Sequence, residues 1–297
     1  MNRDLYQHVT DRIVAALEAG TPPWIRPWSG GLDPFPTNGM SRRPYRGINC
    51  ILLTLEAQLR GFGRNSWLTF RQAKELGAQV RGGEHGTTVI FYKTQELPAA
   101  NAEGEVPQRV APLLKSFTVF NVAQIDQLPE RLQQPVVEPT GWVREHAPEK
   151  LLADSGARIE HGGFAAFYSP EEDRIQLPER ELFADAGAYY ATALHELTHW
   201  SGHASRLNRQ LGRRFGAAAY AMEELIAEIS SAMLCAVCRL EGQLQHASYV
   251  ADWIAILKAD KRAVFTAAAA AQRAADYVEG LAKPSPTEPA VLEEMAA

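Results

Sequence analysis

The sequence contains two histidines four residues apart with a glutamate between them, because residues 195–199 spell HELTH. On an α-helix, His195 and His199 lie about 40° apart around the axis and ~6 Å apart along it, so both imidazoles can reach one metal ion at ~2.0–2.1 Å. Apolar neighbours such as Leu194 and Leu197 indicate that this helix is buried, and a buried imidazole without a partner is costly. The segment therefore predicts a helix that carries two metal ligands, rather than one that exposes two surface histidines.

A site with two histidines needs a third protein ligand, which we expect from a second helix. The segment YAMEELIAEISSAML places Glu224 and Glu228 four residues apart, on one face of an otherwise apolar helix. A buried carboxylate requires a cation or a hydrogen-bond donor. We therefore assign Glu224 as the third ligand and Glu228 as the acceptor that orients a ligand imidazole. The alternatives are the reverse assignment, Glu223 as the ligand, and a purely structural ion pair.

Glu196 follows the first histidine directly, where it can hold a water molecule beside the ion. In such a site the ion lowers the pKa of bound water and polarises a carbonyl group, while the glutamate transfers the proton to the leaving amine. The expected reaction is peptide hydrolysis with Glu196 as the catalytic base. The expected cofactor is one divalent metal ion: zinc fits imidazole and carboxylate ligands best, with manganese, cobalt and nickel as alternatives.

The motif resembles that of zincin metallopeptidases, in which an acidic third ligand from a later helix is the gluzincin arrangement. HELTHWSGH also resembles the opening of the metzincin motif, but the third histidine of that pattern would fall at position 205, which is Ser205. His203 is therefore either an additional ligand or oxyanion contact, or an ordinary loop histidine.

Aromatic and basic side chains interleave in the first third of the chain, where basic residues outnumber acidic ones. Single-stranded nucleic acid binds grooves that combine positive charge with aromatic faces, each stacked base contributing ~1–3 kcal/mol. The candidate DNA contacts are Arg42, Arg43, Tyr45 and Arg46 of the loop RRPYRGIN, together with Trp24, Arg26, Trp28, Arg64, Arg71, Lys74 and Arg81. The alternative is that the aromatic residues pack in the core, as we expect for Trp67 and Phe70, and that the arginines lie on a solvated face.

The pattern of apolar residues predicts an α+β protein with two domains. We expect an N-terminal α+β domain over 1–130, a Pro-rich linker over 131–148, a mainly helical domain with a small sheet over 149–283, and a frayed tail over 284–297. The first domain should contain helices at 3–19, 48–60 and 70–77 and strands at 89–93 and 117–125. The second should contain two short strands joined by a Ser-Pro turn, then helices at 184–201, 219–241, 246–257 and 259–279.

Composition narrows the class of protein. The 297 residues are 46% hydrophobic and contain no apolar run of eighteen, which predicts globular domains and no membrane span. The N-terminal segment lacks the features of a secretory signal, so we expect a cytoplasmic protein. Three cysteines are too few for a disulfide framework, and Cys235 and Cys238 lie in an apolar helical stretch, so all three are expected to be buried thiols.

Several segments are similar, in order and over nearly the whole chain, to ArdC-type antirestriction proteins of conjugative plasmids. They are ALEAGTPPW, RPYRGIN, SWLTFRQA, FTVFNVAQIDQLP, HELTHWSG, EELIAEI and DWIAILKADKRAVFTAAAAAQRAADYV. The resemblance implies an N-terminal domain that binds single-stranded DNA without marked sequence preference and is shared with TraC-type primases. It also implies a C-terminal zincin-like domain and a role in protecting incoming plasmid DNA from restriction in the recipient cell.

Three functional hypotheses follow. The first is an antirestriction protein that binds single-stranded DNA and carries a metal-dependent peptidase site for a protein or peptide substrate. The second is a protease that removes proteins crosslinked to DNA. The third is a non-catalytic protein that coats single-stranded DNA and uses the metal for structure. Glu196 favours a catalytic site, because a closed structural site has no need of a general base.

Overall fold

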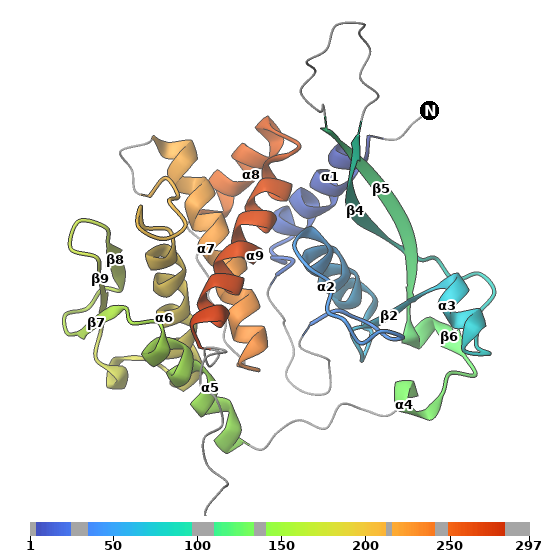
Figure 1. Cartoon of the computed structure of the whole chain (residues 1–297), viewed down its shortest axis with the longest axis horizontal. Coiled ribbons are helices and arrows are strands. Elements are labelled where there is room, and N and C mark those ends of the chain that lie inside the picture. The colour runs from blue at the N-terminus through green and yellow to red at the C-terminus, as the bar shows by residue number, and fades with distance from the viewer. Residues whose placement is uncertain are drawn as a thin grey trace, which may run out of the picture.

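A computed structural model describes residues 4–24, 35–96, 110–133, 141–211, 216–240 and 249–282. A layer of helices lies at its centre, with a small sheet on one side and a larger sheet on the other (Figure 1). The larger sheet belongs to the N-terminal half of the chain, and the smaller sheet precedes the last four helices of the described residues. The architecture is therefore α+β, as the sequence predicts.

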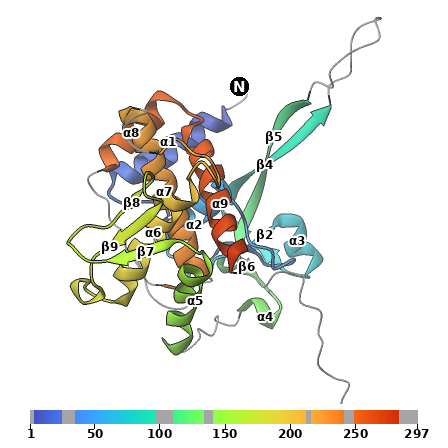
Figure 2. The same ribbon diagram turned by 60° about the vertical axis from the view of Figure 1, so that its left-hand side comes forward.

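The N-terminal half contains most of the strands. Its elements are α1 (Leu5–Glu18), β1 (Thr37–Asn38), α2 (Ile48–Arg60), β2 (Ser66–Thr69), α3 (Phe70–Glu75), β3 (Gln79–Val80), β4 (Thr87–Glu96), β5 (Val110–Asn121), a 3-10 turn (Val122–Gln124), β6 (Ile125–Asp126) and α4 (Glu130–Gln133). The larger sheet has the order β1-β2-β5-β4, and β3 pairs with β6. Strands β4 and β5 pair antiparallel over their whole shared length, and their hairpin projects from the body of the molecule (Figure 2).

Local signals explain where two of these helices begin or end. Helix α2 ends at Gly61, which adopts the left-handed conformation (φ 64°) that glycine favours at a helix C-terminus. Thr69 caps the N-terminus of helix α3: its side chain accepts a hydrogen bond from the Gln72 backbone amide, and the Gln72 side chain accepts one from the Thr69 amide. This reciprocal capping box stabilises the first turn, and the observed helix is two residues shorter than the expected helix at 70–77.

The C-terminal half is mainly helical. Its elements are α5 (Gly141–Asp154), β7 (Arg158–His161), β8 (Phe167–Ser169), β9 (Arg174–Leu177), a 3-10 turn (Arg180–Leu182), α6 (Ala186–Ser201), α7 (Ala217–Val237), α8 (Val250–Ala259) and α9 (Ala263–Leu281). The expected Ser-Pro turn joins β8 to β9, and β7 adds a third strand parallel to β9. The sheet order is β7-β9-β8.

The segment expected to be a linker is partly helical. Helix α5 begins at Gly141, inside the range 131–148, and it contains Pro148. Proline in a helix removes one backbone hydrogen bond and favours a helix end. Here Leu151 and Leu152 are buried in the main core, so tertiary packing stabilises the helix despite the proline. The expected tail at 284–297 lies outside the described residues.

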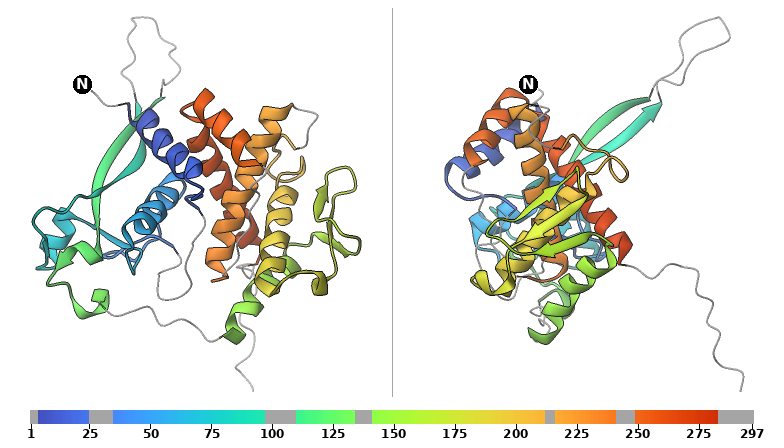
Figure 3. Two further views of the ribbon diagram at one scale, coloured as in Figure 1. Left: turned by 180° about the vertical axis from the view of Figure 1, so that it is seen from behind. Right: turned by 90° about the vertical axis from the view of Figure 1, so that its left-hand side faces the viewer.

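One apolar core extends across both halves of the chain. Val9, Ile13 and Leu17 of α1 belong to the same buried cluster as Leu225 of α7 and Trp253 of α8. Figure 3 shows α1 beside α8, and the Thr10 hydroxyl donates a 2.8 Å hydrogen bond to the Lys261 carbonyl between α8 and α9. Residues that the sequence assigns to separate domains therefore bury a shared interior.

Helices α7 and α9 pack together at the centre of the helical layer. Helix α9 carries the buried alanines Ala267, Ala268 and Ala271, and such small side chains allow neighbouring helices to approach closely. Within the described part of the chain, no helix has both the length and the apolar character that crossing a membrane requires.

Candidate metal centre and nucleic-acid groove

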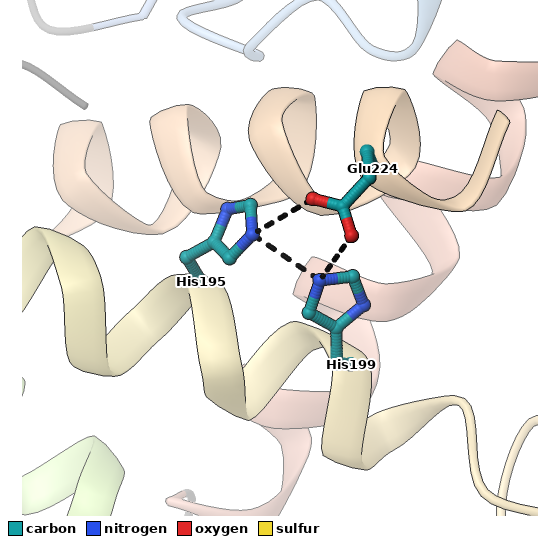
Figure 4. A group of neighbouring side chains, drawn as sticks. All are labelled: His195, His199 and Glu224. Carbon is teal, nitrogen blue, oxygen red and sulfur yellow. Dashed lines mark hydrogen bonds and ion pairs between the residues drawn. The ribbon is translucent and has the colours of Figure 1, made fainter. Parts of the chain in front are cut away.

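Three predicted ligands lie together where α6 packs against α7. His195 and His199 project from one face of α6, and Glu224 projects toward them from α7 (Figure 4). The Nε2 atoms of the two histidines are 3.2 Å apart. Glu224 Oε2 is 3.6 Å from His195 Nε2, and Glu224 Oε1 is 3.6 Å from His199 Nε2.

These distances fit a metal ion held by two imidazoles and a carboxylate. Ligand atoms ~2.0–2.1 Å from a tetrahedral ion lie ~3.3–3.4 Å from one another. The three observed separations, 3.2, 3.6 and 3.6 Å, are close to that value. Two imidazole nitrogens that face each other at this distance share at most one hydrogen bond, whereas a cation satisfies both lone pairs. The donor set therefore suits a divalent ion.

The charge of the site also calls for a cation. Four carboxylates are buried here: Glu196, Glu223, Glu224 and Glu228. Burial alone would lower the pKa of His199, but hydrogen bonds to Glu223 and Glu224 outweigh it and raise that pKa to about 10. Burial alone would raise the pKa of Glu224, but hydrogen bonds from His195 and His199 hold it well below its usual range. The carboxylates thus favour positive charge at the point where the imidazoles meet.

A carboxylate lies near the Nδ1 atom of each ligand histidine, the nitrogen that faces away from the proposed ion. Glu228 Oε2 is 3.7 Å from His195 Nδ1, the position in which the sequence analysis expects an orienting acceptor. Glu223 Oε1 is 3.1 Å from His199 Nδ1, so Glu223 has the equivalent position at the second histidine. The sequence analysis considers Glu223 only as an alternative ligand. It misses Arg209, which donates to both Glu223 oxygens, because nothing in a loop sequence indicates which arginine turns back to a helix end.

The remaining predicted residues of this site are placed less centrally. Glu196 is buried on α6, and its charge contributes to the raised pKa of His199. His203 follows the helix and lies 2.8 Å from the Ser205 hydroxyl through its Nδ1 atom. The ligand group that the described residues form consists of His195, His199 and Glu224, and His203 is outside it.

A groove of about 860 Å³ lies in the N-terminal half, between the RRPYRGIN loop and the β4–β5 hairpin. Basic and aromatic side chains line it from both sides: Arg43, Tyr45 and Arg46 from the loop, and Phe91, Lys115 and Phe117 from the strands. Phe91 and Phe117 are both exposed and pack edge to face, with ring centroids 5.3 Å apart. The loop predicted to bind DNA is therefore one wall of an open groove, and the hairpin residues form the other.

Several other DNA-binding candidates have structural partners away from this groove. Trp24 is a correction to the sequence analysis: its side chain is only 7% exposed and packs edge-on against Trp253, so no base can stack on it. Arg64 is half-buried and donates to the Leu132 carbonyl. Arg71 pairs with Glu75, and Arg81 pairs with Glu84 and Asp126.

The other candidates divide into exposed residues and residues that are not described. Arg42, with a φ of 58°, and Lys74 are exposed. Arg26 and Trp28 lie outside the described residues. Of the two aromatic residues expected in the core, Trp67 is fully buried but Phe70 is exposed. The two residues do not belong to one helix: Trp67 lies in strand β2, and Phe70 is the first residue of α3.

The fold and the metal centre define a zincin-like metallopeptidase domain, and residues 146–270 match the family model with that description. Residues 3–120 match the model described as the N-terminal domain of anti-restriction factor ArdC. The chain is 43% identical over 285 residues to the uncharacterized protein y4eC of Sinorhizobium fredii, and the alignment covers 93% of this chain and 91% of that protein. It is also 40% identical to the DNA primase TraC of Escherichia coli, over 94% of this chain but 27% of TraC.

Solved structures give the same result. The metal-free crystal structure of the antirestriction protein ArdC from plasmid R388 superposes with a TM-score of 0.79 at 43% identity, over 94% of this chain and 98% of that one. Its Mn(II)-bound structure gives a TM-score of 0.77 at the same identity and coverage. The chain therefore belongs to the ArdC family of antirestriction proteins.

Proposed function

We propose that this member of the ArdC family is a metal-dependent peptidase that also binds single-stranded DNA. The observation that carries the peptidase function is the convergence of His195, His199 and Glu224, with Glu196 next to the first ligand on the same helix. A glutamate in that position suits an open catalytic site better than a closed structural one. The Mn(II)-bound structure of the R388 relative supports a divalent ion at this centre, for which zinc remains the best fit to the ligands.

His195, His199 and Glu224 would hold the ion, which when bound acidifies a water molecule and polarises the scissile carbonyl. Glu196 accepts a proton at its carboxylate and passes it to the nitrogen of the leaving amine. Glu223 accepts a hydrogen bond from His199 Nδ1, which fixes the tautomer that presents Nε2 to the ion, and Glu228, 3.7 Å from His195 Nδ1, is placed to orient the other imidazole.

The test compares wild type with Glu196→Gln in a peptide-hydrolysis assay, with and without single-stranded DNA. We expect Glu196→Gln to lose hydrolysis but to keep its metal content, measured by mass spectrometry of the bound metal. Glu171→Gln, which changes an exposed glutamate, is the matched control and should keep both. Hydrolysis by Glu196→Gln at the wild-type rate would contradict the assignment. Stoichiometric metal without any hydrolysis by wild type would favour a structural ion.

The groove between the RRPYRGIN loop and the hairpin supports the DNA-binding function. It combines three basic side chains with three aromatic ones, the two components that non-specific binding of single strands requires. The similarity to the DNA primase TraC supports the same class of ligand. We expect the triple change Arg42→Ala, Arg43→Ala and Arg46→Ala to weaken binding to oligonucleotides of every sequence alike, while Arg158→Ala on β7 has no effect. Unchanged affinity in the triple variant would contradict this location.

The biological role that we propose is protection of incoming conjugative plasmid DNA from restriction. The second candidate, proteolysis of proteins crosslinked to DNA, requires the same two sites. Conjugation into a restricting recipient, with the gene for wild type or Glu196→Gln in the donor, distinguishes roles that need proteolysis from simple coating of single-stranded DNA. Protection by wild type only indicates that proteolysis is needed, and equal protection by both indicates that DNA binding suffices.

A further inference from the structure

Arg209 makes a set of contacts that no role in the proposed reaction explains. Its Nε atom donates to Glu223 Oε2 at 2.9 Å, and Nη2 donates to Glu223 Oε1 at 2.9 Å. Nη2 also donates to the Thr198 carbonyl at 2.6 Å, and Nη1 to the Ser201 hydroxyl at 3.1 Å. The side chain is 11% exposed. One guanidinium therefore joins the C-terminal end of α6 to α7 at the metal centre.

Gly202 makes room for this arginine. The residue has a φ of −80°, which any amino acid adopts, so backbone conformation does not require glycine here. A Cβ atom at this position would lie 2.7 Å from Arg209 Nη2, 2.8 Å from Leu211 Cδ2 and 2.9 Å from Arg209 Cζ. The glycine at the end of HELTHWSG is therefore explained by the close passage of the Arg209 guanidinium and the Leu211 side chain over the helix end.

We propose that Arg209 is a positioning residue for the metal centre. It holds both oxygens of Glu223, so that Glu223 faces the Nδ1 atom of His199 at 3.1 Å and His199 presents Nε2 to the ion. It also excludes Glu223 from the ligand position itself, because a carboxylate held in a bidentate pair cannot turn toward the ion. Glu224 then supplies the third ligand. This inference rests on the proposed metal site.

The neighbouring positions on α7 explain why such a device is needed. Glu223 and Glu224 are consecutive, both are buried, and both lie near the imidazole of His199. Without a fixed partner, either carboxylate could approach the cation, and the unused one would be a buried charge without compensation. Arg209 resolves this competition, because its planar fork matches the carboxylate of Glu223 and leaves that of Glu224 for the ion.

The test measures metal affinity, by competition with a chromophoric chelator, for Arg209→Met, Glu223→Gln and the double variant. Loss of a partner behind a ligand histidine typically weakens metal binding 10- to 100-fold, which we expect for each single variant with Zn(II). Both changes break the same chain of contacts, so their effects should not add. The Zn(II) affinity of the double variant should be at most two- to threefold below that of whichever single variant has the lower affinity. Equal affinity of wild type and Arg209→Met would overturn the proposal.

Arg206→Met is the matched control. Arg206 lies in the same loop, donates to the Trp200 carbonyl at 2.6 Å and stacks 3.9 Å from the Trp200 ring, but its acidic partner is Asp173 rather than Glu223. We expect this variant to destabilise the end of α6 without changing Zn(II) affinity more than about threefold. Equal losses of affinity in Arg206→Met and Arg209→Met would show that general destabilisation of the helix end is responsible, which would overturn the proposal.

Two further measurements guard against misfolding and against failure of the metal site itself. Arg209→Lys keeps the charge but not the fork, so it should restore part of the affinity lost in Arg209→Met. The visible spectrum of bound Co(II) should shift in Arg209→Met, because the ligand geometry changes, and remain that of wild type in Arg206→Met. If wild type binds no metal, the proposed centre is wrong and the inference fails with it. If wild type binds and Arg209→Met binds equally, only the inference fails.

Discussion

The salt dependence of DNA binding gives a quantitative test of the groove. Three basic side chains line it: Arg43, Arg46 and Lys115. Each phosphate contacted on a single strand contributes about −0.7 to the slope of log affinity against log salt, so three contacts predict a slope of about −2. Affinity should then fall roughly fifteen- to twentyfold between 50 and 200 mM salt. Lys115→Ala should reduce the slope to about −1.4 for oligonucleotides of any sequence.

The assay is fluorescence anisotropy with a labelled oligothymidine, titrated at several salt concentrations. Arg71→Ala is the matched control, since Arg71 lies on α3, outside the groove, with its side chain 88% exposed and paired with Glu75. Its slope should equal that of wild type. A wild-type slope near zero would refute the phosphate contacts. A slope that Arg71→Ala lowers and Lys115→Ala leaves unchanged would place the DNA elsewhere.

Four further predictions follow from particular contacts. Tyr45→Ala or Phe117→Ala should weaken binding by ~1–3 kcal/mol at every salt concentration, because stacking does not depend on ions; an effect that disappears at high salt contradicts a stacking role. Asp276→Asn releases Arg46 from its exposed ion pair, so affinity should rise about two- to fivefold in the same titration. Zn(II) at about 1,000 times its Kd should raise the free energy of unfolding by about 4 kcal/mol, measured with denaturant, and His195→Ala should abolish this gain. Burial raises the pKa of Cys50 to about 12, so at pH 8 its thiol is almost wholly protonated and should be alkylated only after unfolding; rapid labelling of native protein in mass spectra would contradict this.

Features determined within one helix are predictable from the sequence. The bounds of α2 agree with the expected 48–60 because an apolar stripe ends at a glycine. The meeting of His195 and His199 depends only on the four-residue spacing of α6. By contrast, the strand over Ser66–Thr69 is not expected, because the spacing of Trp67 and Phe70 in SWLTFRQA is typical of the start of a helix. In the structure this segment contains the end of a strand and the start of a helix.

Features that depend on how two elements pack are not predictable in this way. The sequence shows three glutamates on α7, but only the rotation of α7 relative to α6 decides that Glu224 faces both imidazoles while Glu223 and Glu228 face one each. Arg209 is separated from the motif by a loop whose path no periodicity reveals. Trp24 resembles a stacking residue by composition, yet its partner is Trp253, more than two hundred positions later.

Helix α9 joins the two sites physically. Its Asp276 pairs with Arg46, and its Gln272 accepts a 2.9 Å hydrogen bond from the Gly47 amide, so it holds the loop that forms one wall of the groove. The same helix packs along α7, which carries Glu224. Since α1 also buries its apolar face against the helical layer, separating the chain near residue 130 would expose core from both parts. The two regions that match separate family models therefore share one apolar core, and the groove and the metal centre have a common helical support.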